Sequence, residues 1–165
     1  MIRKIVLFLI VFSLSSGCMA EGRLTADDLQ NPDKLLAHRQ KVTPADRELA
    51  KKMYQHALQA AKKDSASAVK SFSESALIYP TSSALVGLAE YRAKMLAKKD
   101  EKVKRAALGE IMHYLNSAER LNTLDKMLVK DDPTLVVQDK ACTERFLANK
   151  PSSDTCRPVQ WIGLR

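Results

Sequence analysis

The stretch that decides the fold is residues 44–121, in which one tetrapeptide occurs twice, as Ala61-Lys62-Lys63-Asp64 and as Ala97-Lys98-Lys99-Asp100. The two copies begin 36 residues apart. Each copy closes a segment whose apolar residues recur with the period of an α-helix, and another such segment follows it. A period of roughly 30 to 40 residues with two helices per period is typical of stacked helical-repeat proteins. We therefore predict an all-α fold of antiparallel helical hairpins.

Local start signals place the helices around the two tetrapeptides. A polar residue that can accept hydrogen bonds from the first helical turn, often followed by proline, marks a helix start. The predicted starts are Asn31-Pro32, Thr43-Pro44, Ser65 or Ser67, and Ser82 or Ser83, and a fourth long helix is expected from Glu101 to Leu121. Gly87 lies inside a predicted helix, where it costs about 1 kcal/mol relative to alanine. We expect a glycine at this position only if a neighbouring helix packs closely against it.

A family pattern appears within the first hairpin. Its second helix carries Ala68, Phe72, small Ser75 and Pro80 at the spacing of a tetratricopeptide repeat, and Leu85-x-x-Leu88-Ala89 continues into the next unit. Residues 44–121 thus resemble two tetratricopeptide repeats. The second unit departs from the family, with a longer predicted turn at 101–104 and no closing proline. The resemblance implies a concave groove formed by the first helix of each unit, with Tyr54 and Tyr91 lining it.

The first 18 residues have the features of a bacterial export signal. Arg3 and Lys4 precede an apolar run over residues 5–12, which is too short for a transmembrane helix. Residues 14–18 resemble the lipobox of bacterial lipoproteins, which implies lipidation of Cys18. Cleavage after Ala20 is the alternative. Residues 19–43 are then expected to form an N-terminal tether and a short helix.

The two remaining cysteines lie in the predicted C-terminal cap, residues 122–165. Because export leads to an oxidising compartment, we predict a Cys142–Cys156 disulfide. Asp132-Pro133 is expected to restart a capping helix, after a short apolar segment over residues 124–129. The run Val159 to Ile162 is strand-like, and we expect its Trp161 to pack on the capping helix; an exposed recognition strand is the alternative.

Positive charge is expected to gather on one rim, because corresponding turns of stacked hairpins lie side by side. The predicted basic rim comprises Lys62, Lys63, Lys98, Lys99, Lys102, Lys104 and Arg105. The chain carries a net charge of +8, and without Arg3 and Lys4 its 25 basic and 19 acidic residues leave +6. Helix-terminal lysines in solvent and an anionic partner both explain such a rim.

The sequence gives no support for catalysis. His38, His56 and His113 are far apart and have no cysteine or acidic partner at ligand spacing, so no metal site is expected. The five glycines form no phosphate-binding loop, and no serine lies in a nucleophile-elbow motif. We predict no catalytic residue and no cofactor.

The predicted function is therefore that of a non-enzymatic adaptor of the cell envelope. The expected partner is a protein or peptide held in the repeat groove, and no nucleic acid is expected. The predicted location is the periplasm, with the outer membrane reached only through a lipid anchor at Cys18. Two alternatives remain: an exported inhibitor or immunity-type protein, and a basic protein that binds anionic wall polymer or lipid through its rim.

Overall fold

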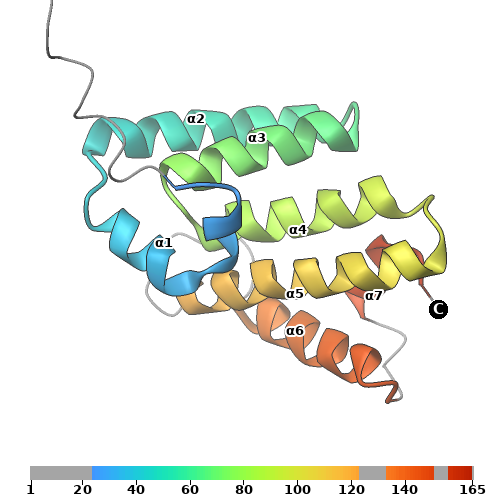
Figure 1. The fold of residues 1–165 in the computed structure, drawn as a ribbon. Coiled ribbons are helices and arrows are strands. Elements are labelled where there is room, and N and C mark those ends of the chain that lie inside the picture. Colours follow the sequence, from blue (N-terminus) through green and yellow to red (C-terminus); the bar gives the residue numbers. More distant parts are fainter. Residues whose placement is uncertain (1–23, 123–132, 151–155, 165) are drawn as a thin grey trace, which may run out of the picture.

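The computed structural model describes residues 24–122, 133–150 and 156–164, and these residues contain seven α-helices, one short 3-10 helix and no strand (Figure 1). The prediction of an all-α fold is confirmed. The elements are η1 (Asp27–Gln30), α1 (Pro32–Arg39), α2 (Pro44–Ala60), α3 (Ser65–Ile78), α4 (Ser82–Leu96), α5 (Glu101–Asn122), α6 (Pro133–Leu147) and α7 (Arg157–Trp161).

Consecutive long helices pack against one another: α2 on α3, α3 on α4, and α4 on α5. Figure 1 shows α2 and α3 side by side along one edge of the molecule, with α4 and α5 forming the next pair. The elements before α2 and after α5 then cover the second pair. Both η1 and α1 pack against α5, α6 packs along α5, and α7 lies mainly against α4. Within the described residues, α2 is therefore an edge helix that packs mainly on α3.

The helix starts are confirmed at Asn31 and Thr43, whose side chains accept hydrogen bonds from the first turns of α1 and α2. The predicted serine caps are wrong for the next two helices. Asp64 caps α3 by accepting from the backbone N–H of Ser67 at 2.7 Å, and Thr81 caps α4 by accepting from Ala84. In both cases the residue just before the predicted serine supplies the acceptor, which leaves the serines inside the first turn.

The two Ala-Lys-Lys-Asp turns have the same construction. In each, the alanine ends the preceding helix and the aspartate caps the next one: Asp64 accepts from Ser67, and Asp100 accepts from the N–H of Val103 at 2.9 Å. The prediction of a longer second turn at 101–104 is wrong, because α5 begins at Glu101. The carboxylate of Asp100 stabilises the first turn of α5 and so keeps these residues helical.

Phe72 of α3 lies at the centre of the packing between the two helix pairs and is 1% exposed. Its ring packs edge-on against Tyr54 of α2, with 5.6 Å between centroids, and is stacked on Tyr91 of α4 at 5.7 Å. Gly87 of α4 faces the same ring, and a Cβ built there would lie 2.6 Å from Phe72 Cε1. The expectation of a close helix approach at Gly87 is therefore confirmed.

The N-terminal elements dock on the far part of α5. Leu29 and Leu35 are fully buried, and Tyr114 of α5 donates a hydrogen bond to Glu110 at 3.0 Å. Arg92 of α4 forms an ion pair with the same carboxylate at 3.3 Å. Burial, followed by the charge of Glu110, raises the pKa of Tyr114 to about 12. The burial of Leu29 and Leu35 and the packing of η1 and α1 on α5 make these N-terminal elements part of the packed structure.

The C-terminal segment is helical, so the predicted strand around Trp161 is wrong. Val159 and Ile162 are both buried, and their separation of three residues suits one face of a helix rather than one face of a strand. Pro158 also lies in the first turn of α7, where its missing N–H costs nothing. Trp161 is partly buried, and the guanidinium of Arg157 lies 5.5 Å from its ring centroid. The predicted segment over residues 124–129 lies outside the described residues.

The predicted disulfide between Cys142 and Cys156 is present, with 5.6 Å between the two Cα atoms. It joins α6 to the start of α7, beside an ion pair between the same two helices. Arg157 Nη2 lies 2.6 Å from Asp139 Oδ2, and the Asp139 side chain is only 4% exposed. Among the described helices, none combines the length and apolar character needed to cross a membrane.

Candidate functional site

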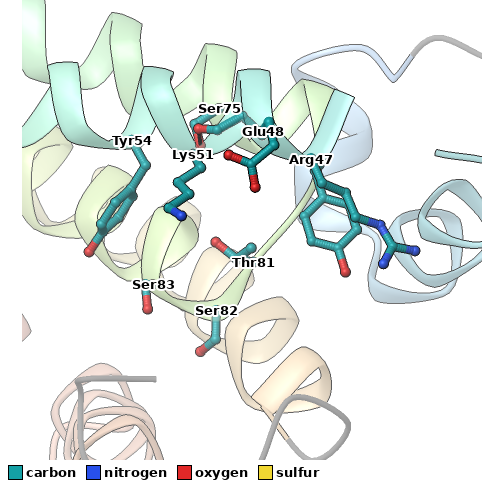
Figure 2. A pocket seen from close by; sticks show the side chains of 10 residues that line it. Arg47, Glu48, Lys51, Tyr54, Ser75, Thr81, Ser82 and Ser83 are labelled. Carbon is teal, nitrogen blue, oxygen red and sulfur yellow. Dashed lines mark hydrogen bonds between the residues drawn. The ribbon is translucent and has the colours of Figure 1, made fainter. Parts of the chain in front are cut away.

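The candidate site is a cleft of about 410 Å³ between α2 and the start of α4. Five α2 residues form one wall, and the start of α4 with its capping residue Thr81 forms the other (Figure 2). The cleft is lined by Arg47, Glu48, Ala50, Lys51, Tyr54, Ser75, Tyr79, Thr81, Ser82 and Ser83. Its lining thus combines two aromatic rings, three charged groups and several hydroxyls, which is a composition suited to binding.

Helix geometry explains why Arg47, Lys51 and Tyr54 face the cleft together. Their spacing of four and then three residues places them on one face of α2. The helix starts with a capping box in which Thr43 and Asp46 each accept a backbone hydrogen bond from the other. The hydrogen bonds from Thr43 hold the pKa of Asp46 below its usual value. This cap fixes the first turn of α2, from which Arg47 and Glu48 project.

The floor of the cleft is held by a buried contact between α2 and α3. Ser75 Oγ donates a hydrogen bond of 2.9 Å to the carbonyl oxygen of Ala50, and both residues are buried. Two small residues let the helices approach closely here, which leaves room above them for the cleft. The edge-on contact between Tyr54 and Phe72 fixes the aromatic side of the wall.

Tyr79 forms one end of the cleft and is held by two arginines. Arg39 Nη2 donates a hydrogen bond of 2.8 Å to the Tyr79 hydroxyl, and its guanidinium lies 4.9 Å from the ring centroid. The guanidinium of Arg47 lies 5.2 Å from the same centroid. His38 Nε2 is 3.1 Å from the Ile78 carbonyl oxygen, which can only accept, so this nitrogen carries the proton. The α1 helix therefore supports the end of α3 at the cleft.

The charges inside the cleft are Arg47, Lys51 and Glu48, a net charge of +1. Figure 2 shows Lys51 and Glu48 extending from α2 toward Thr81 and Ser83. Within the described residues none of these three groups forms an ion pair. The N-terminal end of α4 adds the positive end of its helix dipole on the opposite wall. The electrostatic field of the cleft thus favours an anionic group.

Of the two tyrosines predicted to line the groove, one lines this cleft, although both pack against Phe72. Tyr54 lines the cleft, whereas Tyr91 is stacked on Phe72 beyond it, with Lys94 Nζ 4.6 Å from its ring centroid. Sequence reasoning missed Arg47 and Lys51, although their spacing from Tyr54 indicates a shared face. Sequence reasoning also missed that Tyr79 and the start of α4 line the cleft, because no local signal places them opposite α2.

The seven residues of the predicted basic rim differ in their surroundings. Six of them are exposed, and Lys104 is partly buried, donating a hydrogen bond of 3.1 Å to the carbonyl oxygen of Gly163. Arg105 forms an ion pair with Glu101 at 3.0 Å and lies 5.2 Å from the ring centroid of Phe146. Figure 1 shows the α2–α3 and α4–α5 turns on the same side of the molecule.

A second cleft, of about 680 Å³, lies beside α6 and α7. Its two most buried polar groups already satisfy each other, because Arg157 Nε lies 3.1 Å from both carboxylate oxygens of Asp139. Burial raises the pKa of Asp139, against the opposing effect of Arg157. This cleft therefore offers a ligand fewer open charged groups than the cleft between α2 and α4.

The remaining predicted site residues have these positions. Cys142 and Cys156 are joined in the disulfide, and Cys18 lies outside the described residues. His56 Nδ1 is 3.0 Å from Ser71 Oγ, a contact between α2 and α3. Within the described ranges, no group of three or more histidine, cysteine or acidic residues could hold a metal ion. Comparison with protein-family models, curated proteins and solved structures finds no match for this chain.

Proposed function

We propose that this protein is a non-enzymatic interaction module that holds a peptide segment of a partner protein in the cleft between α2 and α4. The observation that carries the proposal is the cleft itself, in which Tyr54, Lys51 and Arg47 line one face of α2 across from the start of α4. Its hydroxyl groups have no histidine beside them in the lining, so the arrangement suits binding better than nucleophilic catalysis.

The proposed scaffold is a short tetratricopeptide-like array made of the α2–α3 and α4–α5 hairpins. Several features support it. The four residues that carry the family spacing, Ala68, Phe72, Ser75 and Pro80, are all buried between helices. Both hairpins also turn through the same Ala-Lys-Lys-Asp construction. In this proposal η1, α1, α6 and α7 cover the array at its ends.

The proposed location is the cell envelope, on the periplasmic side of the outer membrane. The basis is the sequence of the first 18 residues, with Cys18 as the site of lipid attachment. The disulfide between Cys142 and Cys156 supports this location, because such bonds persist in oxidising compartments.

The chemistry of the cleft indicates what kind of peptide it holds. Tyr54 and Tyr79 provide apolar surface, and Lys51 and Arg47 provide positive charge beside it. We therefore expect an aromatic or aliphatic side chain in the partner, with an aspartate or glutamate close to it. The Glu48 carboxylate lies on the same wall as Lys51 and repels the carboxylate of the peptide, so it limits the affinity.

Selection from a random peptide library displayed on phage tests the proposal. The wild-type protein should enrich peptides in which an acidic residue lies near an aromatic or aliphatic one. Lys51→Glu should weaken binding of the selected peptides about tenfold or more, because it places like charges together. Lys52→Glu is the matched control, since Lys52 is the next residue, is exposed and lies outside the cleft lining.

Glu48→Gln gives the opposite test. Removing the carboxylate that faces the peptide should tighten binding of the same peptides. Enrichment of basic peptides, or equal losses in Lys51→Glu and Lys52→Glu, would show that the cleft does not recognise an acidic segment.

A further inference from the structure

A separate feature of the molecule is the basic rim, the seven residues Lys62, Lys63, Lys98, Lys99, Lys102, Lys104 and Arg105. They come from the α2–α3 turn, the α4–α5 turn and the first turns of α5, which lie on the same side of the molecule in Figure 1. The rim shares no residue with the lining of the α2–α4 cleft. An inference drawn from it is therefore independent of the proposed peptide site.

The three carboxylates beside the rim already take part in local hydrogen bonds or in an ion pair. Asp64 and Asp100 accept backbone hydrogen bonds as helix caps, and Glu101 pairs with Arg105. Seven cations and three carboxylates leave the rim a net charge of +4. Five lysines of the rim form no ion pair within the described residues: Lys62, Lys63, Lys98, Lys99 and Lys102.

Helix stability explains only part of this charge. Lysines after the ends of α2 and α4 complement the negative ends of those helix dipoles. Lys102, Lys104 and Arg105 instead lie in the first turns of α5, where the dipole disfavours cations. Two of these residues have local partners, since Lys104 donates a hydrogen bond to the carbonyl oxygen of Gly163 and Arg105 pairs with Glu101. Lys102 forms no ion pair within the described residues, so neither the helix dipole nor a local ion pair explains its charge.

Exposed apolar side chains accompany the rim. Val103 of α5 is 40% exposed and lies between Lys102 and Lys104 in the sequence. Leu58 of α2 is 46% exposed and lies one helical turn before Lys62. Leu147, 38% exposed, is the last residue of α6, whose end lies on the same side in Figure 1. Three of the five large apolar side chains exposed in the described structure therefore lie near the rim.

From these observations we infer that the basic rim docks on the surface of an anionic lipid bilayer. Lysines attract the headgroups of anionic lipids, and apolar side chains among them enter the boundary between headgroups and acyl chains. A soluble polyanion would use the lysines but would leave Val103 and Leu58 in water. The combination of unpaired lysines and exposed apolar groups therefore favours a membrane surface.

Vesicle co-sedimentation tests the inference with the full chain. One set of vesicles contains phosphatidylcholine alone, and the other contains phosphatidylglycerol and phosphatidylcholine in equal amounts. The readout is the partition coefficient on the anionic vesicles divided by that on the phosphatidylcholine vesicles. This ratio corrects for apolar binding by residues 5–12, which contributes to both. Each lysine near an anionic surface contributes about fivefold in affinity. Lys63→Gln/Lys99→Gln/Lys102→Gln should therefore lower the ratio by roughly a hundredfold.

The matched control is Lys41→Gln/Lys52→Gln/Lys70→Gln, which removes the same charge from exposed lysines outside the rim. This variant should keep the wild-type ratio. Val103→Ser should weaken binding to anionic vesicles but leave binding to inorganic polyphosphate unchanged. Hydrogen exchange of residues 97–103 should slow on anionic vesicles, which locates the contact independently of the N-terminal segment.

Three results would overturn the inference. The first is a partition ratio near one for the wild-type protein. The second is an equal loss in the two triple variants, which would show that total charge matters rather than the rim. The third is unchanged vesicle binding in Val103→Ser together with tight polyphosphate binding, which would assign the rim to a soluble polyanion.

Discussion

Replacing Gly87 with alanine tests the packing on which the arrangement of α2, α3 and α4 depends. The added Cβ would lie 2.6, 2.7 and 2.8 Å from Cε1, Cζ and Cδ1 of Phe72. These contacts are nearly 1 Å too short for carbon atoms, which are optimal at about 3.5–4.0 Å. The ring cannot move aside easily, because Tyr54 and Tyr91 pack against it and it is fully buried.

Two opposing effects set the size of the change. Overpacking a core costs about 1–3 kcal/mol, and replacing a helical glycine with alanine contributes about 1 kcal/mol of stability. The net expectation for Gly87→Ala is a loss of up to about 2 kcal/mol in the free energy of unfolding. Gly109→Ala is the matched control, because a Cβ added at Gly109 of α5 meets no atom within 4 Å beyond its chain neighbours and its own helix backbone. That variant should gain about 1 kcal/mol.

Urea unfolding followed by circular dichroism measures these changes, with Phe72→Leu as a second background. Leucine lacks the ring atoms nearest to Gly87, so Gly87→Ala should cost less there and should approach the gain seen in Gly109→Ala. A Gly87→Ala protein that is as stable as Gly109→Ala would refute the close approach of α3 to α4. A cost that is unchanged in the Phe72→Leu background would refute the assignment to this ring.

Three further predictions concern the ends of the chain. Replacing both Cys142 and Cys156 by serine should lower the free energy of unfolding by about 3 kcal/mol, the value for a loop of about 15 residues. Adding reductant to the wild-type protein should lower the free energy of unfolding by a similar amount in urea unfolding. Asp28 should titrate with a pKa of about 2 by NMR, because Lys34 and then Thr25 donate hydrogen bonds to it, and Lys34→Met should raise that pKa toward the ordinary 3.8. Since the folded-state pKa is lowered, the stabilisation from Asp28 should be complete above pH 3.8 and be lost as the pH falls toward 2. Asp139 has a raised pKa because of burial, so ionising it costs stability as the pH rises from 3.8, and Asp139→Asn should remove that part of the pH dependence.

Short-range signals predicted most of the helical framework. Asn31-Pro32 and Thr43-Pro44 combine a capping side chain with proline, and both mark the observed starts of α1 and α2. The sequence does not single out the cap of α3, because Asp64 and two nearby serines all offer suitable acceptors. Local sequence therefore locates a helix start to within a residue or two, and the geometry of the preceding turn selects the acceptor.

Long-range packing explains what the sequence could not predict. Leu49 follows the helical period of α2 but is exposed, because α2 packs mainly on α3. The run at 159–162 contains residue types that favour strands, yet it is helical; the disulfide and the Arg157–Asp139 ion pair join the start of α7 to α6, and α7 packs mainly on α4. In both cases the deciding contacts come from distant parts of the chain.

The candidate site shows the same limit. The sequence indicates that Arg47, Lys51 and Tyr54 share a helix face, but it does not show what lies opposite them. The opposite wall is the start of α4, at Thr81 and Ser83, and it reaches the cleft only because α3 turns the chain back. A cleft made by elements 30 residues apart is a property of the tertiary structure.

The most direct test of the proposed function is an NMR titration of the isotopically labelled protein with a peptide selected from the library. The proposal predicts that backbone shifts change at Arg47, Lys51 and Tyr54 on α2 and at residues 81–83 on α4. The same peptide should cause smaller changes in Lys51→Glu at equal concentration. Shift changes confined to the cleft beside α6 and α7, or spread evenly over the protein, would contradict the proposal that the cleft between α2 and α4 holds the partner.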